Sequence, residues 1–74
     1  MTTRPERQFL DETARRIAAV RKERGFSQLR LAKESGLTEG HIGHIEQGRR
    51  RPTLVTIYRI ATGLNVSPSR LLRR

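Results

Sequence analysis

The chain has 74 residues and a formal charge of +9, with 14 Arg among its 16 basic residues and only seven acids. One small domain is all that this length supports, and its core is too small for a deep catalytic cavity, so we expect no enzyme. The absence of cysteine excludes disulfides, thiolate zinc sites and a thiol nucleophile, and the absence of a signal sequence or a long apolar run predicts a cytoplasmic protein without membrane attachment.

The predicted elements are five helices and no strands, which makes the expected fold all-α. Residues 1–5 are expected to be disordered, and a first helix is predicted over residues 6–24. The helical spacing of apolar residues up to Gly25 indicates it, and these residues are Leu10, Ala14, Ile17 and Val20. Arg21 lies in the middle of the same stripe and therefore needs a partner in the core.

A second and a third short helix follow, joined by a glycine turn. Ser27 is a good N-cap for the second helix, Leu29 and Ala32 recur at helical spacing, and Gly36 suits the left-handed position that ends a helix. Thr38 then caps the third helix. Such a pair has the layout of a DNA-reading helix-turn-helix.

The third helix has two distinct faces. At about 100° per residue, Ile42 and Ile45 share one side, whereas Gly40, His44 and Gln47 lie on the opposite side. One face is therefore expected to pack and the other to be available to a ligand.

Two more helices are predicted in the last third of the chain. Thr53 caps the fourth, and Gly63 and Asn65 are expected to close it. Its apolar stripe is the clearest in the sequence and consists of Leu54, Ile57, Ile60, Ala61 and Leu64. Ser67 and Pro68 form the start of a last short helix carrying Leu71 and Leu72.

The charge is unevenly distributed along the chain. Residues 1–24 carry a net +3, residues 25–48 a net −1 and residues 49–74 a net +7. Basic segments on both sides of an exposed helix are typical of phosphate contacts that position a protein on DNA without specifying sequence. The alternative is a solvated basic surface with no binding role.

From Gly25 to Leu72 the sequence GFSQLRLAKESGLTEGHIGHIEQGRRRPTLVTIYRIATGLNVSPSRLL resembles the Cro/C1-type (XRE) helix-turn-helix family, and the match begins at about residue 13. The resemblance rests on the Ser-Gln helix start, the Ile-Glu-x-Gly exit, the basic-Pro loop and the Val-Ser-Pro-x-x-Leu-Leu close. It implies a compact, lambda repressor-like domain of five helices that binds operator DNA as a homodimer and regulates transcription. Its variants include phage-type repressors and restriction-modification controllers.

The resemblance, together with the place of each residue on its helix, gives candidate site residues. Base contacts are expected from Thr38, Glu39, Gly40, Gly43 and His44. Phosphate contacts are expected from Ser27, Gln28, Arg30, His41, Gln47, Arg49, Arg50 and Arg51. The two glycines remove side chains where the family usually has them, so either DNA shape carries part of the specificity or the helix approaches the groove floor closely.

Three of these interpretations have alternatives. Arg30 stands at the positive end of a helix dipole, which a DNA phosphate would compensate, or it is simply exposed to solvent. The run Arg49 to Arg51 directly follows the recognition helix, which favours phosphate contact over a localisation signal or a solvated loop. His41 and His44 are three residues apart, but a zinc site needs further ligands, so we expect no metal, cofactor or small-molecule ligand.

Two structural roles complete the expectations. The resemblance pairs Arg21 with Glu46, which lies at the edge of the buried side of its helix; the alternative is an arginine that reaches solvent. A homodimer interface is expected at the C-terminal end, from Leu64, Val66, Leu71 and Leu72, because the last helix is too short to bury both of its leucines. The alternative is that both leucines close the core.

A second functional class is an antitoxin-type protein-interaction module whose DNA binding is secondary. Such a protein commonly needs an extra segment to wrap its toxin, and only residues 1–12 are available here. Double-stranded DNA is therefore the preferred partner.

Overall fold

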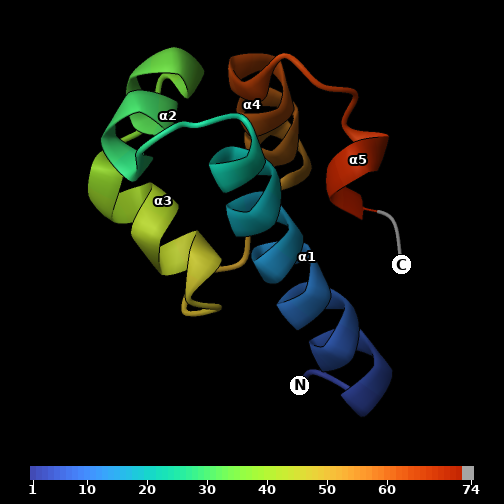
Figure 1. The fold of residues 1–74 in the computed structure, drawn as a ribbon. Helices are drawn as coiled ribbons and strands as arrows, with labels where there is room; N and C mark the ends of the chain where they lie inside the picture. The colour runs from blue at the N-terminus through green and yellow to red at the C-terminus, as the bar shows by residue number, and fades with distance from the viewer. Residues whose placement is uncertain (73–74) are drawn as a thin grey trace.

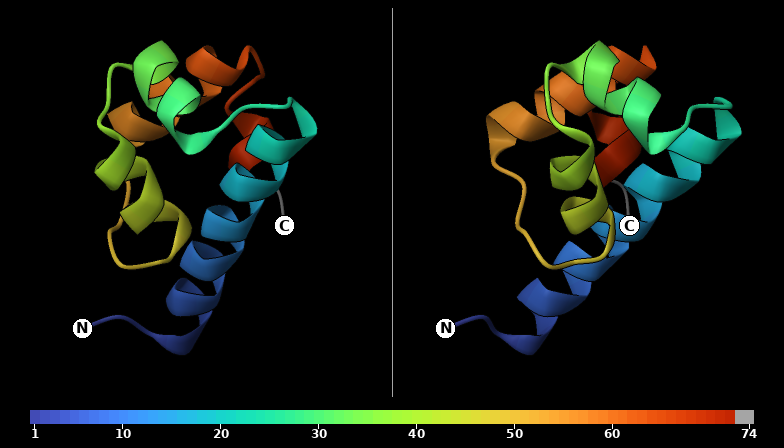
Figure 2. Two further views of the ribbon diagram at one scale, coloured as in Figure 1. Left: turned by 60° about the vertical axis from the view of Figure 1, so that its left-hand side comes forward. Right: turned by 90° about the vertical axis from the view of Figure 1, so that its left-hand side faces the viewer.

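The computed structural model describes residues 1–72, and within them five helices and no strand are present, which confirms the all-α prediction. The helices are α1 (Arg4–Glu23), α2 (Gln28–Ser35), α3 (Glu39–Glu46), α4 (Leu54–Leu64) and α5 (Ser69–Leu72) (Figure 1). The helix α2 packs against α3 and α4, and α5 packs against α1. The first turns of α1 project beyond the rest of the bundle, as the two further views also show (Figure 2).

The helix α1 begins earlier than predicted, and the expectation of disorder through residue 5 is wrong. Thr3 and Glu6 form a reciprocal capping box: the Glu6 amide donates to Thr3 Oγ1 at 3.3 Å and the Thr3 amide donates to Glu6 Oε1 at 3.0 Å. Pro5, in the first turn, needs no hydrogen bond there. The signal was present in the sequence as Thr-x-x-Glu, followed by an apolar run.

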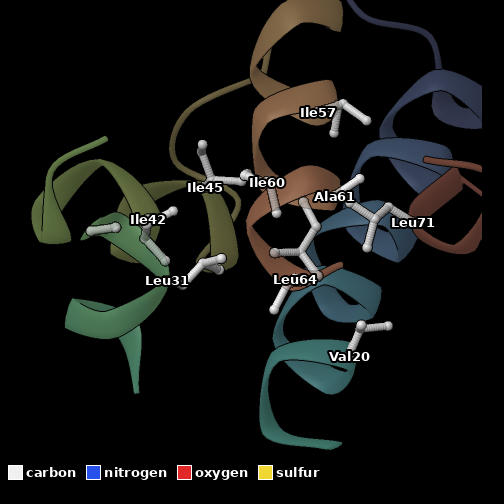
Figure 3. Close-up of a cluster of buried hydrophobic side chains, with 11 residues drawn as sticks. Val20, Leu31, Ile42, Ile45, Ile57, Ile60, Ala61, Leu64 and Leu71 are labelled. Atoms are coloured by element: carbon white, nitrogen blue, oxygen red, sulfur yellow. The ribbon is translucent and has the colours of Figure 1, made fainter. Parts of the chain in front are cut away.

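The core collects side chains from all five helices (Figure 3). Its fully buried large residues are Ile17, Leu31, Ile42, Ile45, Ile60, Leu64 and Leu71. Leu64 and Leu71 have no exposed surface at all. The expectation that these two leucines form part of a dimer interface is therefore wrong, and both close the core instead.

Two residues of the predicted apolar stripes are exposed. Leu29 on α2 is exposed, and its place in the core is taken by Leu31. Leu54 at the start of α4 is 80% exposed, because it lies about 80° around the helix from the centre of the buried stripe. A residue at that angle is buried only where a neighbouring element covers it.

Gly63 does not end α4, as the sequence suggested; it lies inside the helix. A Cβ on Gly63 would stand 3.2 Å from the carbonyl carbon of Glu34 and 3.2 Å from the amide nitrogen of Ser35. Glycine at this position therefore allows α4 to pack closely against the last turn of α2. The helix is ended by Asn65, which adopts the left-handed conformation at φ 58°.

Candidate nucleic-acid interface

The second and third helices form a helix-turn-helix with well-defined caps. Ser27 Oγ accepts a hydrogen bond from the Arg30 amide at 3.0 Å, and Thr38 Oγ1 accepts one from the His41 amide at 3.0 Å. Gly36, at φ 72°, ends α2 and turns the chain toward α3. These three local signals, all visible in the sequence, set the limits of both helices.

The helix α3 presents a polar face opposite its buried isoleucines. Glu39, Gly40, His44 and Gln47 are exposed on it, whereas His41 is half-buried. No neighbouring atom lies within 4 Å of where a Gly40 Cβ would stand. The helix could accommodate a side chain there, so the glycine leaves this part of the backbone open to a ligand.

A buried ion pair joins α1 to the end of α3, as the sequence predicts. Arg21 Nε donates to Glu46 Oε2 at 2.7 Å, and a second guanidinium nitrogen donates to Glu46 Oε1 at 3.0 Å. The remaining nitrogen donates to the Phe26 carbonyl at 2.8 Å, which fixes the turn between α1 and α2. The two side chains are only 10% and 6% exposed, so Arg21 does not reach solvent.

Gln28 is the link between this ion pair and the candidate DNA surface. Its Nε2 donates to Glu46 Oε1 at 3.0 Å, and its Oε1 lies 3.8 Å from where a Gly43 Cβ would stand. Because Gln28 is the first residue of α2, this contact holds the start of α2 against the recognition helix α3.

Arg30 contacts an aromatic ring, which was not predicted from the sequence. Its guanidinium carbon lies 4.0 Å from the centroid of the Phe26 ring, in cation–π geometry. The side chain is nonetheless exposed and remains accessible to a phosphate. The sequence signal for this contact is the position of Phe26, four residues before Arg30.

The segment between α3 and α4 carries Arg49, Arg50 and Arg51, all three exposed. The amides of Arg49 and Arg50 donate to the His44 carbonyl at 2.9 and 3.3 Å, and Gly48 takes the left-handed conformation at φ 76°. The backbone of this loop is thus attached to the end of α3, and its three arginines are exposed directly after that helix.

Exposed apolar residues gather at the start of α4. Leu54, Val55 and Tyr58 are 80%, 61% and 62% exposed, and we call them the α4 apolar patch. Val55 and Tyr58 belong to no predicted apolar stripe, and the exposure of Leu54 contradicts its predicted place in the core. Of the residues predicted for a dimer interface, Val66 and Leu72 keep partial exposure.

Two kinds of feature are absent from residues 1–72. None of their helices combines the length and apolar character required to cross a membrane. Their His, Asp and Glu side chains form no group of three or more that could hold a metal ion.

These features define a helix-turn-helix domain with a polar recognition helix and a basic loop beside it. The chain belongs to the Helix-turn-helix family, whose model matches residues 17–71, and the resemblance to the Cro/C1 (XRE) type is thereby confirmed.

Its relatives include regulators of several kinds. The chain is 41% identical over 58 residues to the HTH-type transcriptional regulator SutR of Escherichia coli, covering 78% of this chain and 31% of that protein. It is 38% identical over 61 residues to the control protein C.SmaI of Serratia marcescens, covering 82% and 73% of the two chains. The chain thus spans about a third of SutR's length.

Among solved structures, the fold is similar to the restriction-modification controller protein C.AhdI from Aeromonas hydrophila. The TM-score is 0.81 at 37% sequence identity, and the match covers 84% of this chain and 94% of the other. The compact five-helix prediction therefore holds for the fold as a whole.

Proposed function

We propose that this DNA-binding regulator acts in the cytoplasm as a homodimer that recognises a near-palindromic operator and controls transcription from it. The observation that carries the proposal is the exposed polar face of α3, followed directly by the exposed cations of the Arg49–Arg51 loop. An α-helix with such a face fits the major groove of B-DNA, and flanking cations fit its phosphates.

Within this proposal the residues of α3 divide by their chemistry. Glu39 can accept a hydrogen bond from a cytosine amino group, and His44 can donate one to guanine. Thr38 stands at the start of the helix and completes the base-contacting group together with Gly40 and Gly43, whose backbone can approach the bases closely.

The phosphate contacts come from the residues around that face. Long cations in a loop suit phosphates better than base edges, which assigns Arg49, Arg50 and Arg51 to the DNA backbone. The other members of this group stand at the ends or flanks of α2 and α3, and they are Ser27, Gln28, Arg30, His41 and Gln47.

The dimer is proposed to form through the α4 apolar patch, extended by Leu72. A monomer rarely leaves three large apolar side chains exposed side by side on one helix. A two-fold axis would place the two copies of α3 about 34 Å apart, one DNA turn, which calls for an operator with two half-sites at that spacing.

Base contacts and phosphate contacts can be distinguished by measuring the affinity of each variant for two DNA duplexes. One is an operator selected from a random DNA pool, and the other has random sequence. His44→Ala should weaken operator binding by about 1–3 kcal/mol and leave random binding nearly unchanged, because it removes a base contact. Arg50→Gln should weaken both by the same factor. The assignment is wrong if His44→Ala weakens both duplexes alike, and the proposed function is wrong if the wild type selects no sequence.

A further inference from the structure

The first turns of α1 have no role in the helix-turn-helix itself. Every residue from Arg4 to Phe9 is exposed, and this segment projects beyond the bundle (Figures 1 and 2). The loop that leaves α3 lies against this part of α1, near Arg7 and Leu10. Where the two meet, a hollow of about 110 Å³ opens to the surface.

Four arginines line that hollow, and we call it the arginine hollow. Arg7 comes from α1, and Arg49, Arg50 and Arg51 come from the loop. Its remaining lining is apolar or glycine and includes Leu10 and Ile45, so no carboxylate faces it.

None of these four guanidinium groups is neutralised within the part of the chain that the structure describes. The two ion pairs found among residues 1–72 join Arg21 to Glu46 and Arg70 to Glu23. The nearby acid Asp11 approaches Gly48 from a neighbouring hollow. Glu6 lines the adjoining hollow together with Arg51, so Asp11 and Glu6 are two acids near four cations. Like charges grouped around one hollow repel one another, and an anion in it would reduce that repulsion.

The backbone on both sides of the hollow is held in place. Arg7 stands on a helix whose start is fixed by the Thr3–Glu6 capping box, and the loop is attached to α3 through the His44 carbonyl. The hollow has the volume of about four water molecules, enough for a compact anion with little solvent. Guanidinium groups bind phosphate oxygens through short, charge-assisted hydrogen bonds.

We propose that Arg7 and the Arg49–Arg51 loop together bind one backbone phosphate of DNA. The inference rests on the proposed function and adds to it a contact from α1, outside the groove that α3 enters. Because a phosphate is the same on every sequence, this contact raises affinity for operator and random DNA alike.

The test uses the full chain and a random-sequence duplex, with dissociation constants measured by fluorescence anisotropy over a range of salt concentrations. Arg7→Gln should weaken binding about tenfold. It should also lower the slope of log affinity against log salt by about 0.9 for each subunit. Lys33→Gln, which removes an exposed cation from α2, is the matched control and should change neither quantity. Arg7→Lys should restore most of the affinity.

A double-mutant cycle tests whether one phosphate is shared. Arg7→Gln and Arg51→Gln combined should weaken binding less than the product of the single effects, because both contact the same anion. Effects that simply multiply, or an Arg7→Gln variant that behaves like Lys33→Gln, would overturn the inference. The proposed function survives either result, since it fails only if the wild type itself shows no selective binding.

Discussion

The ion pair between Arg21 and Glu46 is the contact whose loss should cost this domain most. Replacing Glu46 by alanine leaves the Arg21 guanidinium with the Phe26 carbonyl as its only remaining hydrogen-bond partner. It also removes the acceptor of the Gln28 amide. A buried cation would then have no counter-charge, and the contacts among α1, α2 and α3 would be weakened together.

The expected magnitude follows from the burial of the pair. With both side chains at or below 10% exposure, solvent screens the interaction weakly, and breaking such a pair costs about 3–5 kcal/mol. A domain of this size has a total stability of about 4–11 kcal/mol. The substitution should therefore lower the melting temperature by at least about 12 °C and could unfold the protein near physiological temperature.

Urea unfolding followed by far-ultraviolet circular dichroism measures this loss, since the fold is helical. The matched control is Glu23→Ala, which breaks the exposed pair with Arg70 and should cost less than about 1 kcal/mol. The double variant Arg21→Met/Glu46→Leu removes both charges and should be more stable than either single variant. Equal losses for Glu46→Ala and Glu23→Ala would refute the reasoning.

Three further predictions concern glycine, the cap of α4 and the dimer. Gly63→Ala should lower the free energy of unfolding by about 1 kcal/mol, because its Cβ meets the backbone of α2. Gly40→Ala should raise it by about 1 kcal/mol, because its Cβ meets no neighbouring atom and alanine favours the helix. Urea unfolding measures both changes, and the opposite sign for either variant contradicts the prediction. Asn65→Ala should lower the free energy of unfolding by about 1 kcal/mol, since the left-handed conformation is unfavourable for alanine. Asn65→Gly should leave it almost unchanged in the same measurement. Tyr58→Glu should give monomers in sedimentation equilibrium while Tyr58→Phe keeps the dimer; a wild type that is monomeric at micromolar concentration contradicts the proposed interface.

Helix limits were the most predictable feature because caps are local. Ser27, Gly36 and Thr38 act within a few residues along the chain, and their chemistry can be read without knowing the fold. The same locality applies to Thr3 and Glu6, whose capping box indicates a helix start, not disorder, within residues 1–5.

Burial was less predictable because it depends on neighbours far away in the chain. Periodicity alone does not decide between Leu29 and Leu31 on α2, or show that α4 leaves Leu54 uncovered. Gly63 was predicted to end α4, because a glycine near the end of an apolar stripe is typical of a helix end. Its actual role is a close contact with α2, almost 30 residues earlier, which the local sequence does not show. For the candidate site, the two isoleucines of α3 were enough to predict its exposed face, whereas the meeting of Arg7 with the loop required the three-dimensional structure.

The recognition helix depends on the rest of the domain for its own stability. Two of its eight residues are glycines, each costing about 1 kcal/mol relative to alanine, and a helix this short is not stable alone in water. Its conformation is therefore maintained by the burial of Ile42 and Ile45 and by the contacts that Glu46 makes at its last turn. Because Gln28 shares that carboxylate, the same contacts that stabilise α3 also orient α2 beside it. The buried polar atoms of Arg21, Gln28 and Glu46 thus contribute both to the stability of the fold and to the geometry offered to DNA, and a change there should affect both.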